Sequence, residues 1–308
     1  MDRPTAGREA PSGAGSLGGA GAGTLACMDG VRQAAGGAGE AARVEPVGPP
    51  NRPATPDTLE AAATLLAGAE RIVVFSGAGI STESGIPDFR SPGGLWTRYD
   101  PRQLGFRRYV ADPGTRRLAW RLRRELHHLE ARPNPAHLAC VRLAQSGRLA
   151  GVITQNIDGL HSDAGLPSEL VCEVHGTGRQ FVCLGCGDRG PMGEAVARVE
   201  AGEEDPACLR CGGIIKAATV SFGQNIPAEV WARAEALTAA CDAFVAVGSS
   251  MVVQPAAGLP RKARRLGATL VIVNREPTPL DDLADAVLLG EAGSLLPALV
   301  DATIAEPG

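Results

Sequence analysis

The feature that most constrains this chain is a glycine-rich stretch, Ser76–Trp96, which follows directly on the apolar segment 71–75. A β-branched strand that stops at a glycine turn is the usual way in which an α/β fold presents backbone N–H groups to a phosphate. The dehydrogenase pattern Gly-x-Gly-x-x-Gly is not met, because Thr82 occupies the position of its third glycine. A glycine turn can also be purely structural, but this stretch predicts a loop that holds a dinucleotide in a different pose.

Length and charge narrow the class of protein. A chain of 308 residues is long enough for one large domain or two small ones. Its formal net charge of −4 gives no basic footprint for nucleic acid. The longest apolar runs, at 244–247 and 269–273, are strand-sized and far shorter than the ~18 residues of a membrane helix. We expect a soluble, cytoplasmic protein with neither a nucleic-acid nor a membrane partner.

The chain divides by composition at about residue 54. Residues 1–54 are rich in glycine, alanine and proline and have almost no large apolar side chains, so they bury too little surface to offset the entropy of ordering. We expect this segment to be disordered. Residues 55–308 are predicted to form one folded domain, with a helical insertion at about 97–149 and a cysteine-rich module at about 178–215.

Strand and helix signals alternate through the folded part. Thr55 as N-cap and Pro56 at the first helical position open the first helix. Such alternation predicts an α/β fold, with a Rossmann-like parallel sheet, helices on both faces, and ligands at the carboxyl ends of the strands. Strands are predicted at 71–75, 151–154, 170–174, Val220, 243–247, 269–273 and 286–288, and further helices at 112–131, 134–147, 227–240, 255–266 and 294–304.

Polar residues follow the second and third strands, at what should be one edge of the sheet. Gln155, Asn156 and Asp158 come after the second strand, and His175 ends the third, followed by Gly176. Polar residues of this kind are common turn formers, and a lone histidine at a strand end is more often structural. Their shared edge favours a binding site, in which His175 could remove a hydroxyl proton near neutral pH.

Two Cys-x-x-Cys pairs, separated by residues 187–207, are the second strong signal. This spacing suits a tetrahedral zinc site, and four thiolates leave no coordination position open for water, so the ion should be structural. A zinc ribbon can serve nucleic-acid or protein contact, but the acidic flank at 200–205 argues against nucleic acid. The predicted zinc ligands are Cys183, Cys186, Cys208 and Cys211, and the predicted small buried cysteines are Cys140, Cys172 and Cys241.

Three runs in the opening stretch, GAGIS, SGIPDFR and GLW, resemble the cofactor loop of the sirtuins, the NAD-dependent protein lysine deacylases. The TQNID run at 154–158 and the histidine at 175 match the same family, and the resemblance covers about residues 56–303 in unbroken order. It implies NAD as co-substrate, an acyl-lysine protein or peptide as partner, and free lysine, nicotinamide and O-acyl-ADP-ribose as products. The catalytic residues that it implies are His175, Asn156 and Asp158.

The resemblance also implies which residues surround the cofactor. Gln155 and Asn156 would touch the nicotinamide-side ribose, while Ile157 and Asp158 would grip the carboxamide. Ala292, in the loop after the last strand, would lie near the adenine. The remaining cofactor-binding residues that it implies are Gly77, Ala78, Gly79, Ser81, Thr82, Asp88, Phe89, Arg90, Trp96, Gly248, Ser249, Ser250, Asn274 and Glu276.

The run at 219–224 resembles the sirtuin stretch that lines the substrate lysine, where a peptide adds as a strand by main-chain pairing. Ala217 and Gln224 depart from the proline and glutamate that many members carry, which bears on substrate preference more than on activity. The substrate-binding residues implied by the resemblance are Val220, Phe222 and Gly223.

Details of the resemblance favour one branch of the family and one acyl class. The runs GLW, FGQ and SSMVVQPAAGLP are closer to the class IV branch with bacterial relatives. Desuccinylating sirtuins carry a Tyr-x-x-Arg pair. The corresponding residues here are Trp120 and Arg123, so the arginine is kept and the tyrosine is not. We therefore expect acetyl or another neutral acyl group.

Two rival functions stay open from the sequence. One is a protein mono-ADP-ribosyltransferase that uses the same NAD site, and the other is a non-catalytic NAD-binding module, which would leave His175 without a role. The remaining histidines are not candidate bases: His127, His128 and His137 are expected at the surface, and His161 is expected to shape a turn.

Overall fold

The computed structural model describes residues 58–89, 94–127 and 131–305 of the chain. Several sequence predictions fall outside these residues. They concern the disorder of residues 1–54, the helix start at Thr55 and Pro56, Arg90, His128, and the side chains of Trp96 and His127.

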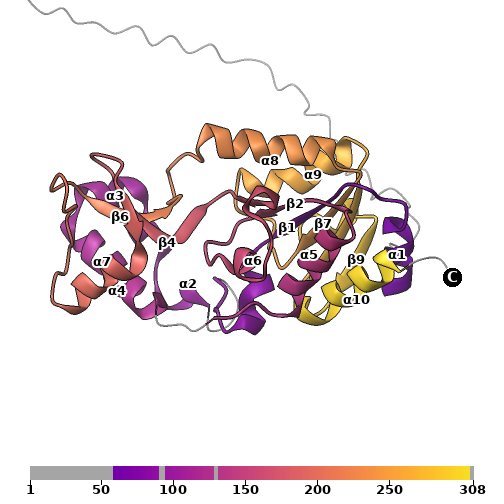
Figure 1. Ribbon diagram of the computed structural model, residues 1–308, viewed down its shortest axis with the longest axis horizontal. Coiled ribbons are helices and arrows are strands. Elements are labelled where there is room, and N and C mark those ends of the chain that lie inside the picture. Colours follow the sequence, from indigo (N-terminus) through magenta and orange to yellow (C-terminus); the bar gives the residue numbers. More distant parts are fainter. Residues whose placement is uncertain (1–57, 90–93, 128–130, 306–308) are drawn as a thin grey trace, which may run out of the picture. The chain divides into compact units, whose positions relative to one another are not determined.

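A six-stranded parallel sheet forms the centre of the folded part, in the strand order β3-β2-β1-β7-β8-β9 (Figure 1). Two of its inner strands, β1 (Ile72–Ser76) and β7 (Ala243–Val247), are buried at every position. Such continuous apolar runs are typical of parallel strands that are covered on both faces. The remaining strands are β2 (Leu149–Thr154), β3 (Val171–Glu173), β8 (Thr269–Asn274) and β9 (Ala286–Leu289).

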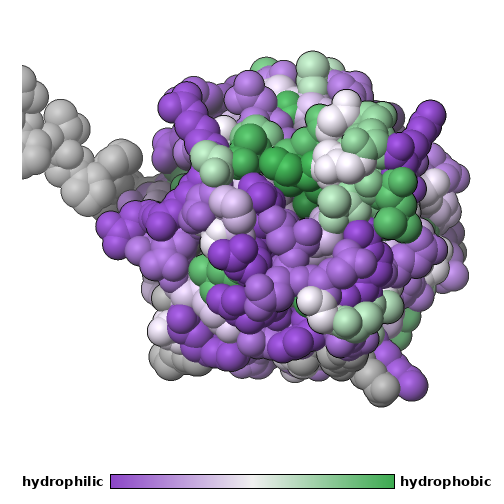
Figure 2. All heavy atoms as spheres, turned by 90° about the vertical axis from the view of Figure 1, so that its left-hand side faces the viewer, coloured by the Kyte–Doolittle hydropathy of each residue, from purple (hydrophilic) through white to green (hydrophobic). Residues whose placement is uncertain are grey.

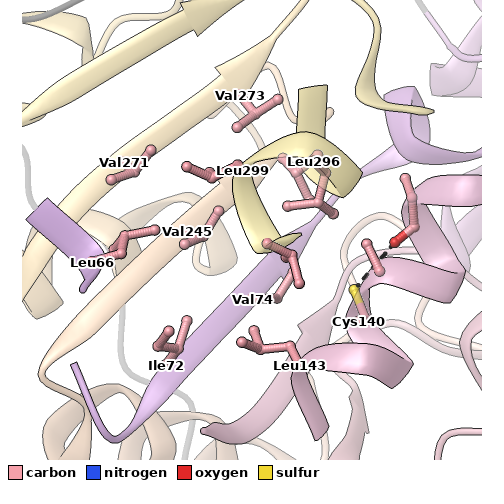
Figure 3. Close-up of a cluster of buried hydrophobic side chains, with 14 of the residues drawn as sticks. Leu66, Ile72, Val74, Cys140, Leu143, Val245, Val271, Val273, Leu296 and Leu299 are labelled. Atoms are coloured by element: carbon pink, nitrogen blue, oxygen red, sulfur yellow. Dashed lines mark hydrogen bonds between the residues drawn. The ribbon is translucent and has the colours of Figure 1, made fainter. Parts of the chain in front are cut away.

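Helices cover both faces of this sheet, each face with its own apolar core. Because alternate residues of a strand face opposite sides, Val74 and Val245 lie in one core, while Phe75 and Phe244 lie in the other with ring centroids 5.8 Å apart. Figure 3 shows Leu296 in the first core, beside Val74. The predicted α/β fold class is confirmed. The first core lies under α1 (Leu59–Leu66), α5 (Pro135–Gln145) and α10 (Ala292–Ile304), and the second under α8 (Ala228–Ala240) and α9 (Leu259–Arg265).

A second, antiparallel sheet in the strand order β5-β4-β6 forms a smaller module with a core of its own. Trp120, Met192 and Ile215 are buried together in that core. Figure 2 views the molecule from this side and shows hydrophobic residues gathered in one area of a mainly hydrophilic face. The elements of the module are β4 (Gly176–Cys183), β5 (Arg189–Pro191), β6 (Ile215–Thr219), α3 (Phe106–Ala111), α4 (Pro113–His127) and α7 (Met192–Glu200).

The prediction that Val220 lies in a strand of the parallel sheet is wrong. The chain forms β6 instead, which pairs with β4 of the smaller sheet, and Val220 lies one residue beyond its end. The Val220 N–H donates to the His175 carbonyl at 2.8 Å, so this segment runs beside the residue that precedes β4. A short apolar run looks alike in either kind of sheet, which is why the sequence pattern did not separate them.

Within the described residues the first helix begins at Leu59, and the side chain of its N-cap, Thr58, accepts a backbone N–H. The predicted opening of the next helix at Asp112 and Pro113 is confirmed, because α4 begins at Pro113 and the Asp112 carboxylate accepts from the backbone of its first turn. Ala292 lies in no loop: it is the first residue of α10 and is buried there.

The other elements are short. None of the helices in the described ranges combines the length and the apolar character needed to cross a bilayer. The remaining elements are the helices α2 (Leu95–Arg98) and α6 (Leu160–Asp163) and the 3-10 helices η1 (Ala78–Ser84), η2 (Pro101–Leu104), η3 (Ser168–Leu170), η4 (Ala256–Gly258) and η5 (Asp281–Leu283).

Candidate active site

The strand order brings the predicted site segments to one edge of the central sheet. The strands β3, β2, β1, β7 and β8 are neighbours in that order and all parallel, so their carboxyl ends lie side by side. The glycine-rich stretch follows β1, Gln155 follows β2, His175 comes two residues after β3, and Gly248 follows β7. Segments that are far apart in the sequence therefore meet at one edge.

A cavity of about 720 Å³ opens at this edge, with walls from the central sheet and from the smaller module. It brings the amide of Asn156, the carboxylate residue Asp158 and the imidazole of His175 to one space. The predicted site residues that line the cavity are Gly77, Ala78, Phe89, Gln155, Asn156, Ile157, Asp158, His175, Val220, Phe222, Gly223 and Ser250. The described site residues outside its lining are Gly79, Ser81, Thr82, Asp88, Gly248, Ser249, Asn274, Glu276 and Ala292.

The imidazole of His175 is held by one backbone hydrogen bond. Its Nδ1 lies 2.9 Å from the carbonyl oxygen of Gln155. Because a carbonyl can only accept, Nδ1 must carry the proton, and in the neutral ring Nε2 is then an unprotonated acceptor. Burial lowers the pKa of His175 below its usual value, and the bond to Gln155 opposes this shift in part. His175 is therefore a neutral base near pH 7.

The carboxylate of Asp158 is oriented from two sides. The Ser81 hydroxyl donates to Oδ2 at 2.8 Å, and the backbone N–H of Leu160 donates to Oδ1 at 2.9 Å. The Asn156 amide donates to the same Ser81 oxygen at 3.1 Å and to the Gly77 carbonyl at 3.2 Å. The glycine-rich stretch after β1 thus sets the positions of both polar residues that follow β2.

Two glycines let the tips of β1 and β7 approach closely. A Cβ at Gly77 would lie 2.7 Å from the Gly248 carbonyl oxygen, and one at Gly79 would lie 2.8 Å from the Gly248 Cα. Beside this contact the Gln155 amide donates to the Ser249 hydroxyl at 2.8 Å. The edge therefore offers backbone groups and small polar side chains that suit a phosphate-bearing ligand, and Gly77, Ala78 and Ser250 of this edge line the cavity.

The prediction that His137 lies at the surface is wrong, because its side chain is completely buried. It lies at the third position of α5, where its ring accepts from the Asn134 backbone in a capping box. Its Nε2 is 3.5 Å from the Ser81 hydroxyl, and its ring centroid is 5.0 Å from that of His161. The spacing of an asparagine N-cap and a histidine three residues later could have signalled this position.

Both of these histidines are uncharged near neutral pH. Burial lowers the pKa of His137 to about 4, partly opposed by Asp158. Burial, together with His137, lowers the pKa of His161 to about 3. His161 Nε2 lies 2.9 Å from the Ser76 hydroxyl at the tip of β1, so this ring supports the edge of the sheet from behind.

Of the predicted peptide-binding residues in the cavity lining, Phe222 and Gly223 are exposed and Val220 is half-buried. The side chain of Phe222 is 50% exposed although it is large and apolar. The Phe222 carbonyl accepts from the backbone of Phe106 at 2.9 Å, so the segment is anchored to the smaller module. An exposed aromatic beside a cavity and an adjacent main chain suit the docking of an extended peptide.

The comparison with protein-family models decides the family. The model described as the Sir2 family matches residues 77–255, which include the glycine-rich stretch, the tip of β2 and His175. The chain belongs to the Sir2 family. The resemblance to the sirtuins found in the sequence is thereby confirmed.

Individual Sir2 relatives match this chain over nearly their whole length. NAD-dependent protein deacetylase 2 of Streptomyces coelicolor is 51% identical over 238 residues, which cover 76% of this chain and 98% of the relative. NAD-dependent protein deacylase 2 of Archaeoglobus fulgidus is 43% identical over 251 residues, covering 80% and 96%. A crystal structure of a Sir2 homolog–NAD complex matches with a TM-score of 0.71 and 34% identity, covering 78% of this chain and 92% of that one.

The smaller module of this Sir2 chain carries four cysteines that fit a structural zinc ion. The Sγ atoms of Cys183 and Cys211 are 3.5 Å apart, those of Cys186 and Cys208 are 3.7 Å apart, and all four lie within 4.8 Å of one another. Tetrahedral zinc with bonds of about 2.3 Å places its sulfur ligands about 3.8 Å apart. Backbone N–H groups of Gly185 and Gly213 point at two of the sulfurs, which favours thiolates.

We predict that Cys186→Ser loses the metal and destabilises the smaller module. Structural zinc contributes on the order of 10 kcal/mol to such small folds, so the unfolding temperature should fall by about 10 °C or more. Elemental analysis should find one zinc per wild-type chain and well below that in Cys186→Ser. Cys241→Ser, which changes a half-buried cysteine outside the cluster, is the matched control and should keep a full zinc. Full zinc in Cys186→Ser would contradict the four-cysteine site.

Proposed function

We propose that this chain is an NAD-dependent protein lysine deacylase that releases nicotinamide and forms free lysine and O-acyl-ADP-ribose. The observation that carries the proposal is the presence of Asn156, Asp158 and His175 on one cavity in a Sir2-family chain. Relatives from Streptomyces coelicolor and Bradyrhizobium diazoefficiens, which match over 98% and 93% of their own length, are named NAD-dependent protein deacetylases. Related Sir2 structures contain a deacetylated p53 peptide or a myristoylated histone peptide, which supports an acyl-lysine peptide as the partner.

Four residues of the cavity lining have a chemical role in this proposal. Bound NAD supplies the nicotinamide-ribose carbon to which the acyl oxygen of the substrate adds as nicotinamide leaves. Asp158, oriented by Ser81, accepts from the carboxamide N–H and so selects nicotinamide. Asn156 and Gln155 lie beside it and hold the ribose. His175 takes a proton from a ribose hydroxyl, because its Nε2 is the unprotonated nitrogen of the neutral ring. The hydroxyl oxygen then attacks the acyl carbon, and one water molecule is consumed as free lysine leaves.

The first test is turnover with an acetyl-lysine peptide. Wild-type protein should release nicotinamide only when NAD and the acylated peptide are both present. His175→Ala should lower deacylation by at least about a hundredfold, the usual contribution of a positioned general base. Full activity of His175→Ala, or no nicotinamide from the wild type, would overturn the proposal. A label from NAD that stays on the acceptor protein after denaturation would favour ADP-ribosyl transfer instead.

The pH dependence of the wild type gives a second test. A general base must be neutral to act, so kcat/KM should rise with pH through the pKa of His175 and level off above it. Because burial lowers that pKa below its usual value, the midpoint of the acid limb should lie below pH 6.5, and activity should be flat between pH 7 and 8. A midpoint above pH 7 would show that another group is titrating.

One part of the cavity lining bears on the acyl group. Leu104, Leu122, Leu126 and Met192 belong to the lining, and their apolar side chains suit a neutral acyl chain. Arg123 also lines the cavity, but Trp120, its partner in the expected pair, is buried in the core of the smaller module and is not a lining residue. The sequence alone did not identify these apolar lining residues, of which Leu122 and Leu126 lie on α4.

We predict that acetyl- and decanoyl-lysine peptides are both deacylated, and that a succinyl-lysine peptide of the same sequence is turned over at least about tenfold more slowly. The reason is that burying a carboxylate against an apolar wall is costly unless its hydrogen bonds are replaced. Nicotinamide release at equal peptide concentrations measures the three rates. Succinyl-lysine turnover equal to or faster than acetyl-lysine turnover would contradict the neutral-acyl proposal and would assign the acyl carboxylate to Arg123.

A further inference from the structure

One guanidinium links three separate elements beside the cavity. We propose that Arg179 of β4 is a positioning residue that latches residues 155–159, here called the nicotinamide loop, to the smaller module and so sets the affinity for nicotinamide. This inference rests on the proposed function, because it concerns the carboxamide grip of Asp158. Arg179 itself is half exposed and lines the cavity, but its bonds go to the loop and to α6.

The contacts of Arg179 fix both its plane and its position. Its Nε donates to the backbone carbonyl of Asp158 at 2.8 Å. Its two terminal nitrogens grip the carboxylate of Asp163, one of them at 2.7 Å from Oδ1 and the other at Oδ2. A fork of this kind holds a planar guanidinium in one orientation, which a single ammonium group could not do. The loop and the end of α6 are thus tied to one strand.

The nicotinamide loop is shaped to receive this side chain. Gly159 has φ +74°, and a Cβ there would lie 2.2 Å from Arg179 Nε, so only glycine leaves room for the guanidinium. One residue before Arg179, the Gly178 backbone N–H donates to the Ile157 carbonyl at 2.8 Å. The strand therefore holds the carbonyls of Ile157 and Asp158, the two residues assigned to the carboxamide.

The latch complements the bonds that hold the Asp158 carboxylate. Ser81 and Leu160 orient the carboxylate, whereas Arg179 holds the carbonyl of the same residue. Without Arg179 the peptide between Asp158 and Gly159 could rotate while the carboxylate kept its partners. We therefore expect a weaker grip on the carboxamide, with the fold retained.

The charges around the loop support the same role. Burial raises the pKa of Glu173, and the nearby charge of Asp158 raises it further, while Arg179 acts in the opposite direction. Arg179 also lowers the pKa of Asp163 by hydrogen bonding. The pair with Asp163 is 46% and 39% exposed in its two side chains, and pairs this exposed contribute little to stability. The Arg179–Asp163 pair should therefore affect the geometry of the nicotinamide loop and not the stability of the fold.

The test compares Arg179→Gln with a matched control. Arg198 makes the same kind of contacts in the same module, with Glu203 as its carboxylate and the Ala207 carbonyl as its backbone acceptor, and it does not line the cavity. The measurements are the inhibition constant of nicotinamide, the KM for NAD, and kcat with a saturating acetyl-lysine peptide. The affinity for NAD by calorimetry adds a readout that does not need turnover.

Arg179→Gln should raise the nicotinamide inhibition constant and the KM for NAD about tenfold each, the effect of losing one charge-assisted hydrogen bond network, and leave kcat within about threefold. Asp163→Asn should shift both constants in the same direction, and the double variant should do no more than Arg179→Gln, since the two residues act as one unit. Arg198→Gln should leave both constants within about twofold of the wild type.

Unchanged nicotinamide and NAD constants in Arg179→Gln would overturn the latch, as would equal changes in Arg198→Gln or a fall in kcat alone. If Arg179→Gln does not fold, as judged by its thermal unfolding, Asp163→Asn decides, because it keeps the shape of the pair. A wild type that binds NAD without turnover would refute the proposed function but not the latch, which the calorimetric comparison would still support or reject.

Discussion

The contact between the tips of β1 and β7 is the constraint on which the site depends. Gly77 and Gly79 pack directly on the backbone of Gly248, with no space for a side chain between them. The Gly79 N–H also donates to the Gly248 carbonyl at 2.8 Å. This contact therefore fixes the position and the direction of the chain where the glycine-rich stretch leaves β1. The positions of Ser81, and through it of Asn156 and Asp158, follow from that departure.

The site draws on two structures with different sources of stability. The central sheet is held by apolar burial on both faces, which is ample in a sheet of six strands. The smaller module has few buried apolar residues around Trp120, Met192 and Ile215, and a core of this size usually needs a metal or disulfides. The four-cysteine cluster supplies that support without entering the chemistry. The lining of the cavity comes partly from the stable sheet edge and partly from the smaller module.

The sequence was informative where a feature is local or follows from parallel connectivity. Continuous apolar runs gave the inner strands of the sheet, and the parallel order placed the residues after β2 and β3 at one edge. It failed where the outcome depends on what covers a residue. The spacing within α5 predicts on which side of the helix His137 lies, but it does not predict that the glycine-rich stretch covers that side. The apolar run before Val220 does not show which of the two sheets the segment joins. Neither the bond of Arg179 to the Asp158 carbonyl nor the cavity wall on α4 has a local signature.

The two uncharged imidazoles behind the glycine-rich stretch make the fold sensitive to acid. An unfolded chain would protonate His137 and His161 near pH 6.5, whereas the folded protein resists this until about pH 4 and 3. Between these values the unfolded state binds more protons, so the free energy of unfolding falls as the medium becomes more acidic. The loss is concentrated at the rings that touch Ser76 and Ser81. Acidification should therefore destabilise the glycine-rich stretch around Ser76 and Ser81 before it destabilises the rest of the central sheet.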